Sequence, residues 1–185
     1  MQSFLTSERA CGILAHITSL PGPFGVGDIG SASFRFIDFL KQAGQKYWQI
    51  LPTVPTSLYF DSSPYMSSSA FAGSPLLICP DSLVDQGLLT TRDLQNRPRF
   101  SPYIADFRQV DDFKRGLLER AYASFSPAQD SRYHQFISRT PWLKDYALFM
   151  SLNEVNGNRP WTEWPKELAR RAPAALSAFE ERYKN

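Results

Sequence analysis

The pattern of apolar and polar positions predicts a strand, a helix and a second strand at the front of the chain. The run GILAHITSL, residues 12–20, is apolar and of strand length, and a Pro-Gly-Pro sequence ends it. The next run, SASFRFIDFLKQAG, has apolar residues at helical spacing, with Ser31 as the expected N-cap and Gly44 as the expected stop. A second strand follows in KYWQILP, residues 46–52. This order predicts a βαβ unit with two parallel strands.

The rear of the chain has mainly helical spacing. PLLICP, residues 75–80, is a candidate for one more short strand, and residues 81–103 read as loosely structured. Helices are predicted for residues 111–125, which Asp111 and Asp112 open, and for 132–138. Another helix is expected between an N-cap at Thr140 and the stop signal Asn156-Gly157, and a last one begins after Pro173.

These elements include too few strands for a finished sheet. Parallel sheets are normally covered on both faces within larger α/β folds, so a two-stranded parallel sheet is not expected to be stable alone. The chain therefore reads as the front part of something larger. In that case the face of the sheet that carries Trp48 and Ile50 should be exposed.

The most distinctive segment is the serine- and aromatic-rich run of residues 59–75, which follows the second strand. It carries a single charge, Asp61, and has neither a helical nor a strand period, which predicts an ordered loop. Its hydroxyls and aromatic rings suit a neutral polyhydroxylated ligand such as a sugar. Because the run contains no Lys or Arg, it suits a phosphate or a nucleic acid poorly.

Composition excludes several classes of protein. At 185 residues, with 43% hydrophobic and 14% aromatic residues, the chain is globular rather than disordered. The net charge is only +2 and the basic residues are scattered, so no nucleic-acid partner is expected. The uncharged stretches are too short to cross a membrane, and the N-terminus lacks a signal-peptide pattern. Two cysteines, Cys11 and Cys79, then indicate a cytoplasmic protein with reduced thiols.

The sequence GVGDIG, residues 25–30, matches the G-x-G-x-x-G pattern of dinucleotide-binding sites. Two observations count against that interpretation. Four residues separate the predicted strand from Gly25, whereas the fingerprint turns directly off its strand, and no acidic residue ends the second strand. A glycine-rich turn into the first helix is the simpler interpretation, with a nucleotide-dependent enzyme as the alternative.

Side chains that could perform catalysis are sparse. His16 lies inside the first predicted strand, where a buried, hydrogen-bonded histidine is the first interpretation and a role in a binding cleft the second. His134 is expected at the surface. Asp28 reads as a turn or cap residue, and Asp61 as a hydrogen-bonding residue of the loop. No catalytic pair, metal site or cofactor site is predicted.

Taken together, four segments resemble the 4-alpha-glucanotransferases of glycoside hydrolase family 77, called amylomaltase or disproportionating enzyme. They are GILAHITSLPGPFGVGDIG, KYWQILP with the following P-T, SSPYMSSSAFAGSP, and WLKDYALF with RPWTEWP. The resemblance is collinear over nearly the whole chain. It implies an α/β fold, the N-terminal part of a (β/α)8 TIM barrel with inserted, mainly helical subdomains. Residues 1–56 would form the first βαβ unit, 57–80 a substrate-binding loop region, and 81–185 a mainly helical insertion, leaving the barrel incomplete.

The resemblance implies a cytoplasmic enzyme of maltodextrin and glycogen metabolism that transfers α-1,4-glucan segments between maltodextrins. Such a retaining reaction needs two carboxyl groups about 5 Å apart. In the family they come from later barrel strands, beyond Asn185, so no catalytic residue is carried over and the chain alone is expected to be inactive. α-1,4-Glucans such as maltose and maltodextrins are the implied ligands, no cofactor is implied, and the missing C-terminal part of the enzyme is a further expected partner.

The resemblance also implies a binding role for particular loop residues. Tyr65, with Ser63 beside it, matches the serine and tyrosine that the family places near the reactive sugar, and Asp61 is predicted to bind substrate with them. For an accessory glucan surface that the family builds from tyrosines, the nearest matches are Tyr59 or Phe60 and Phe107, some of which lack the hydroxyl. A non-catalytic glucan-binding module is the alternative function.

Overall fold

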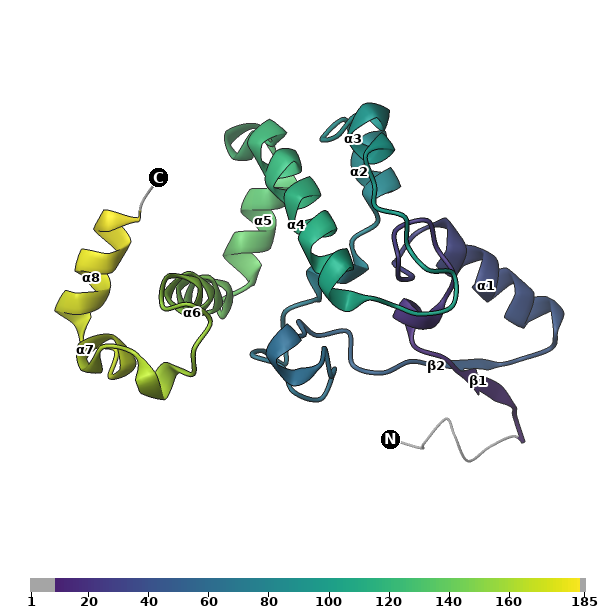
Figure 1. The fold of residues 1–185 in the computed structure, drawn as a ribbon, viewed down its shortest axis with the longest axis horizontal. Helices are drawn as coiled ribbons and strands as arrows, with labels where there is room; N and C mark the ends of the chain where they lie inside the picture. Colours follow the sequence, from purple (N-terminus) through teal and green to yellow (C-terminus); the bar gives the residue numbers. More distant parts are fainter. Residues whose placement is uncertain (1–8, 184–185) are drawn as a thin grey trace. The chain divides into compact units, whose positions relative to one another are not determined.

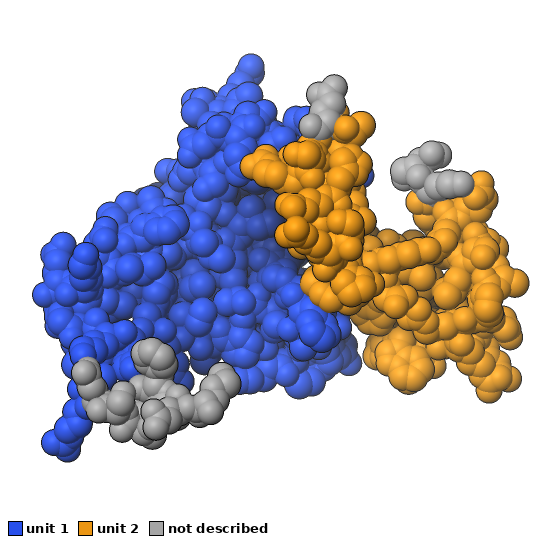
Figure 2. Space-filling view, turned by 180° about the vertical axis from the view of Figure 1, so that it is seen from behind, with its two compact units in different colours: residues 1–125 blue, residues 126–185 orange. Residues whose placement is uncertain are grey.

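The computed structural model describes residues 9–183, and helices with one small parallel sheet make up its fold (Figure 1). By packing, the chain divides into two compact units, residues 1–125 and 126–185 (Figure 2). The sequence predicts three segments by their function, 1–56, 57–80 and 81–185. The division by packing does not test these functions, so the three segments stay predictions. The prediction about a signal peptide falls mostly on residues outside the described part.

The predicted βαβ unit is present in the first unit. Strands β1 (Gly12–Leu14) and β2 (Tyr47–Gln49) are parallel neighbours, and helix α1 (Ser31–Gln42) connects them (Figure 1). The first strand is shorter than residues 12–20. Beyond Ala15 the chain folds back into the 3-10 turn η2 (Ile17–Ser19), because the N–H of Ser19 bonds to the carbonyl of His16 instead of to a partner strand. His16 therefore caps this turn and does not lie inside the strand.

Helix α1 ends as predicted but begins one residue away from the predicted cap. Gly30, not Ser31, occupies the N-cap position, and the Ser31 hydroxyl accepts a hydrogen bond from Arg35. At the other end Gly44 has a φ of +71°, and the N–H groups of Gly44 and Gln45 bond to carbonyls in the last turn. These two bonds form a Schellman motif, which requires a left-handed residue and so favours glycine.

Large apolar side chains on the sheet and on α1 remain exposed. Leu14 is 62% exposed, Phe34 60% and Ile50 40%, which confirms the exposure expected for Ile50. Trp48 is half-buried, because the ring of Phe36 packs edge-on against it at 5.1 Å. Two short strands cover little of α1. Many apolar side chains in this part of the molecule are therefore exposed instead of forming a core.

The segment that follows the serine-rich loop is more ordered than the sequence indicates. Residues 75–77 form the 3-10 turn η4 (Pro75–Leu77) and not a strand. Helices α2 (Pro80–Asp85) and α3 (Thr91–Gln95) occupy the stretch that reads as loosely structured. A capping box between Thr90 and Asp93 starts α3, since each residue's side chain satisfies the other's backbone N–H. Both helices are short, which explains why no long helical period marks them.

Helix α4 (Phe107–Ser124) is the longest helix of the first unit and begins earlier than predicted. The carboxylate of Asp106 accepts the N–H of Gln109 at 3.0 Å and so caps the helix. Asp111, predicted to open the helix, instead pairs with Arg115 one turn later, at 2.8 Å. On the buried side of α4, Leu117 and Ala121 form a core cluster with Leu89, against which Phe113 and residues of α2 and α3 pack.

A buried ion pair joins α4 to the glycine-rich turn. Lys114 is 2% exposed, and its Nζ lies 3.2 Å from the Asp28 carboxylate, 2.6 Å from the Leu76 carbonyl and 3.0 Å from the Ile78 carbonyl. These acceptors use all three donors of the ammonium group. Burial raises the pKa of Asp28 and lowers that of Lys114, and the attraction between the two partly offsets both effects. Asp28 is therefore more than the turn or cap residue predicted for it.

The glycines of the G-x-G-x-x-G pattern are explained by packing. Gly25 has a φ of +83°, and a side chain there would meet Phe100 and Val110. A Cβ at Gly27 would collide with the carbonyl oxygens of Ile17 and Leu20 in and after the turn η2. The pattern thus fits the predicted glycine-rich turn that leads into α1.

Gly27→Ala should destabilise the protein by about 1–3 kcal/mol, because backbone atoms that cannot move aside oppose the added methyl group. Gly73→Ala is the matched control, since a Cβ at Gly73 meets no atom within 4 Å. Its effect should stay within about 0.5 kcal/mol. Urea unfolding followed by circular dichroism measures both, and equal midpoints would contradict the packing explanation.

The second unit consists of helices α5 (Ser131–Arg139), α6 (Leu143–Val155), α7 (Lys166–Ala169) and α8 (Pro173–Arg182). Helix α6 stops at Asn156-Gly157 as predicted, but its N-cap is Trp142 and not Thr140. The core of the second unit is formed by Leu152 of α6, by Trp164, and by Phe179 of α8. The indole N–H of Trp164 donates to the Arg159 carbonyl at 2.9 Å, which closes the tryptophan-rich turn of residues 159–165 on itself.

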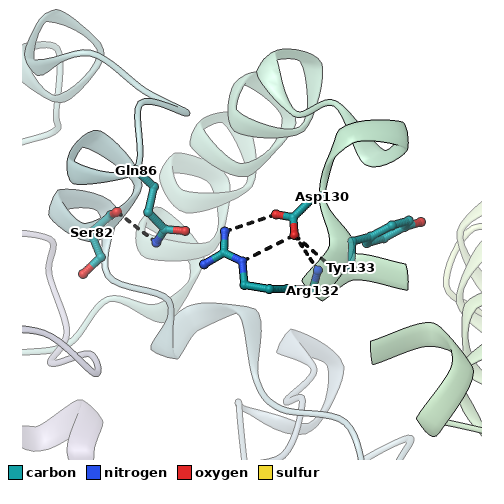
Figure 3. A network of polar contacts seen from close by, with 5 residues as sticks. All are labelled: Ser82, Gln86, Asp130, Arg132 and Tyr133. Carbon is teal, nitrogen blue, oxygen red and sulfur yellow. Dashed lines mark hydrogen bonds and ion pairs between the residues drawn. The ribbon is translucent and has the colours of Figure 1, made fainter. Parts of the chain in front are cut away.

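Helix α5 starts at a cap that the sequence does not single out. The Asp130 carboxylate accepts the backbone N–H groups of Arg132 and Tyr133 and also the Arg132 guanidinium (Figure 3). The guanidinium is the largest of the effects that lower the pKa of Asp130. Figure 3 also shows Gln86, the C-cap residue of α2 in the first unit, whose side-chain amide donates to the Ser82 carbonyl at 3.1 Å.

Two further observations concern the described part of the chain. Cys11 is exposed, Cys79 is buried, and both are free thiols. Among residues 9–183, no helix combines the length and the apolar character that a membrane span requires.

Candidate substrate-binding site

A pocket of about 230 Å³ opens where the chain leaves the two strands. One wall comes from His16, Thr18 and Ser19, which follow β1, and another from residues 51–56, which follow β2. The serine-rich loop, the turn η4 and the first residue of α4 complete it. In α/β proteins ligands bind outside the carboxyl ends of parallel strands, and this pocket lies at that end of β1 and β2. The fold thus makes it the first candidate for a functional site.

Seven of the sixteen described residues that line the pocket carry a hydroxyl group, and apolar Leu, Val and Pro side chains make up most of the others. A carboxylate, a half-buried imidazole and an aromatic ring accompany them, and none of the described lining residues is Lys or Arg. Such a lining offers hydrogen bonds without a net positive charge, which suits a neutral polyhydroxylated molecule and not a phosphate. The side chains that carry these groups are Thr18, Ser19, Thr53, Thr56, Ser62, Ser63, Ser74, Asp61, His16 and Phe107.

Several serine hydroxyls in and beside the loop form hydrogen bonds that hold the conformation of the loop backbone. The hydroxyls of Ser57 and Ser63 accept the N–H groups two residues further on, and the Ser69 hydroxyl accepts those of Phe71 and Ala72. The Ser67 hydroxyl donates to the Pro55 carbonyl at 2.7 Å. These short-range bonds are the turns that serine favours, and they explain how a segment without helix or strand is ordered. Part of the serine content is therefore structural, which the sequence alone does not reveal.

The predicted substrate-binding residues are only partly brought together. Asp61 and Ser63 line the pocket, as does Ser62 between them. Asp61 and Ser62 have φ values of 50° and 57°, in the left-handed region, so the backbone turns sharply here. Tyr65 is not among the described lining residues and is 71% exposed. Its backbone N–H bonds to the Ser63 hydroxyl at 3.4 Å, so the backbone of Tyr65 is held next to a residue of the pocket lining.

The predicted accessory residues differ in exposure. Tyr59 and Phe60 form an exposed aromatic pair, edge to face, with ring centroids 4.9 Å apart. Phe107 is half-buried, packs against the core residues Val26, Leu76 and Val110, and lines the pocket. Phe107 therefore belongs to the same pocket lining as Asp61 and Ser63. Whether any of the three binds a glucan stays a prediction.

His16 differs from the hydrogen-bonded histidine that the sequence predicts. The residue is half-buried, and its Nδ1 is enclosed by protein without a hydrogen-bond partner among the described residues. Burial lowers the pKa of His16, which favours a neutral imidazole at neutral pH. Its place in the lining corresponds to the second interpretation, a binding cleft. His134, in contrast, lies exposed on α5, as expected.

Comparison with known proteins shows to which family the chain belongs. A family model described as 4-alpha-glucanotransferase, of glycoside hydrolase family 77, matches residues 15–185. The chain belongs to the 4-alpha-glucanotransferase family. This confirms the resemblance that the sequence motifs indicate.

Relatives within the 4-alpha-glucanotransferase family are similar along almost the whole chain. The enzyme of Aquifex aeolicus is 44% identical over 169 residues, which are 91% of this chain and 34% of that protein. The enzyme of Synechocystis is 40% identical, over 97% of this chain and 36% of its own length. Among solved structures, an amylomaltase from Streptococcus agalactiae in complex with acarbose superimposes with a TM-score of 0.87 at 37% identity, covering 96% of this chain and 36% of that one. The chain thus spans about a third of the length of these relatives.

Proposed function

We propose that this chain forms the N-terminal part of a 4-alpha-glucanotransferase and supplies one wall of its glucan site. The observation that carries the proposal is the pocket at the carboxyl ends of β1 and β2, whose described lining has seven hydroxyl-bearing side chains and no Lys or Arg. The similar amylomaltase was solved with acarbose, which supports a glucan-like ligand for this pocket. The proposed ligands are maltose and maltodextrins, and the cytoplasmic location stays a prediction from the sequence.

The two strands are proposed to be the first of a (β/α)8 barrel. Both are parallel, a helix connects them, and the sheet has open edges with exposed apolar side chains such as Leu14 and Ile50. In a closed barrel the neighbouring strands would pair with these edges, and the outer ring of helices would cover the apolar surface. Further strands of such an enzyme are thus the proposed partner of this surface.

The carboxylates of the described part do not supply the pair that a retaining transfer needs. Asp61 is the one carboxylate among the described lining residues of the pocket, and Asp28 is held in the ion pair with Lys114. A retaining reaction uses a nucleophile and an acid/base about 5 Å apart. We therefore assign Asp61, Ser63 and Tyr65 to substrate binding, and both reacting carboxylates to the two thirds of the relatives that this chain does not span.

Tyr65→Ala should weaken the binding of maltoheptaose roughly tenfold, because the variant loses a hydroxyl and an aromatic face beside the pocket. Isothermal titration calorimetry on the 185-residue chain measures the effect. Tyr103→Ala is the matched control, since Tyr103 is 93% exposed and is not among the described lining residues. If the two variants bind maltoheptaose equally well, Tyr65 is not part of the site. If the unmodified chain gives no heat with maltoheptaose, the proposed glucan site is wrong.

A chimera distinguishes the enzyme from the alternative, a non-catalytic glucan-binding module. In it, this chain replaces the matching third of the Aquifex aeolicus relative. Glucose release from maltotriose by the chimera, with none from the 185-residue chain alone, is the expected result. A folded chimera that binds maltoheptaose but releases no glucose would favour the binding module. Turnover by the chain alone would contradict the assignment of the carboxylates.

A further inference from the structure

The imidazole of His16 has one enclosed and one accessible nitrogen. Nδ1 is buried and has no partner among the described residues, whereas Nε2 is not enclosed and forms no hydrogen bond within the same part of the chain. His16 lines the pocket, so Nε2 is the nitrogen that a molecule in the pocket can reach. The ring thus presents a single polar atom to the site.

The enclosed nitrogen determines which tautomer the ring adopts. A neutral imidazole carries one N–H and one lone pair. In native backbones a buried N–H without an acceptor is rarer than a carbonyl lone pair without a donor, and we extend this preference to the imidazole. The proton therefore belongs on Nε2, and the lone pair on Nδ1. Burial, by lowering the pKa of His16, keeps the ring in this neutral state.

Hydrogen bonds hold the backbone at and beside His16 in place. The N–H of Ala15 bonds to the Gln49 carbonyl at 3.0 Å, and the Ala15 carbonyl accepts the Trp48 indole N–H at 2.7 Å. The carbonyl of His16 itself accepts the N–H of Ser19 at 3.0 Å. These bonds connect the residue to the end of β1, to β2 and to the turn η2. The backbone that carries the ring is thus fixed, and the enclosure of Nδ1 restricts the ring itself, whereas the hydrogens of serine and threonine hydroxyls can rotate.

We propose that His16 is a substrate-binding residue whose Nε2–H donates a hydrogen bond to a hydroxyl of the glucose unit in the pocket. Asp61, in the same lining, can only accept, so the two side chains bind a sugar hydroxyl in complementary ways. The inference rests on the proposed glucan site and adds to it a neutral donor of fixed direction. A site that hydrogen-bonds a hydroxyl discriminates strongly against sugars that lack it, because its own polar group is then left unpaired.

The chain offers a built-in control for a direct test, because its two histidines lie in different environments. His16 lines the pocket of the first unit, and His134 is exposed on α5 of the second. Long-range proton–nitrogen spectra of the imidazole rings are recorded at neutral pH while maltotriose is added. The expected result is an Nε2–H tautomer for His16 before addition, a shift of its Nε2 resonance on addition, and unchanged His134 signals. An Nδ1–H tautomer, or a His16 resonance that maltotriose leaves in place, overturns the proposal.

Two variants separate hydrogen bonding from a merely structural role. The amide nitrogen of His16→Gln can occupy the place of Nε2, whereas that of His16→Asn reaches only the place of Nδ1. His16→Asn should lose roughly tenfold in maltotriose affinity, and His16→Gln should retain most of it. The reverse order, or equal losses, contradicts the proposal. Where a variant fails to fold, the spectra of the unmodified chain decide alone.

The same titration keeps this inference apart from the proposed function. Backbone amide signals of residues 61–63 report whether maltotriose enters the pocket at all. If those signals move and His16 does not, the glucan site stands and the role of His16 is wrong. If neither moves at saturating maltotriose, the proposed glucan site is wrong, and the inference falls with it.

Discussion

Lys114→Met should destabilise the first unit by about 3–5 kcal/mol at neutral pH, the range found when one partner of a buried ion pair is removed. The methionine fills the space but leaves the Asp28 carboxylate buried without its cation, and the Leu76 and Ile78 carbonyls without their donor. A buried charge without a partner is among the costliest defects in a folded protein. Urea unfolding followed by circular dichroism measures the loss.

The loss should depend on pH in a defined direction. Burial raises the pKa of Asp28, and without Lys114 the main effect that lowers it disappears. A carboxyl group whose pKa is raised on folding contributes stability that is present below its unfolded pKa, about 4, and is lost as the pH rises through the folded pKa. The defect in Lys114→Met should therefore shrink toward pH 4 and reach its full size at neutral pH.

Two controls accompany this experiment. Asp28→Asn combined with Lys114→Met removes both charges and should recover part of the lost stability, because no buried charge remains. Lys144→Met removes an exposed lysine whose contact with Glu180 is 3.8 Å long, and exposed pairs contribute at most about 1 kcal/mol. If Lys114→Met costs no more than Lys144→Met, or if its cost is the same in acid, the ion pair does not have the role assigned to it.

Leu117→Ala should cost about 2–5 kcal/mol, the usual range for deleting a fully buried leucine side chain. Leu117 is 1% exposed and lies at the centre of the cluster through which α4 holds α2 and α3. The cavity would face Leu89 and Phe113, and the short helices have little else to support them. Hydrogen exchange of the amides in residues 80–95 should accelerate together with the loss of global stability.

Leu14→Ala is the matched control for this substitution. Leu14 is 62% exposed in β1, so the same chemical change removes little buried surface there and should cost within about 0.5 kcal/mol. The unfolding midpoint in urea compares the two variants directly. Equal shifts, or unchanged exchange in residues 80–95, would show that α2 and α3 do not depend on this cluster.

Local pattern predicted those elements whose causes lie close together in the chain. Helix α1, the stop at Gly44 and the parallel pairing of β1 with β2 follow from apolar spacing, from a glycine in the left-handed region and from the handedness of βαβ units. The motifs around Tyr65 indicated the family, because they combine specific residue types within a few positions of one another. Helices α2 and α3 are so short that their apolar residues show no recognisable helical period.

Positions set by contacts between distant residues could not be predicted in this way. The N-cap of α4 is Asp106, whose carboxylate accepts the N–H of Gln109, and that of α6 is Trp142, which makes no side-chain cap bond, so the capping residues in the sequence do not by themselves determine where a helix begins. The composition of the candidate site has the same cause. Phe107 belongs to the pocket only because α4 packs against Val26 and Leu76, from two earlier parts of the chain.

The sequence by itself determined the family, the βαβ unit and the sugar-compatible chemistry of residues 59–75, since each depends on residue types at short spacing. Only the tertiary structure decided that Asp28 pairs with Lys114, 86 residues away, and that His16 leaves the strand and lines the pocket. The physical reason is the same in both cases. Burial changes what a polar side chain costs and what it can bind, and burial is a property of the packed chain rather than of any segment within it.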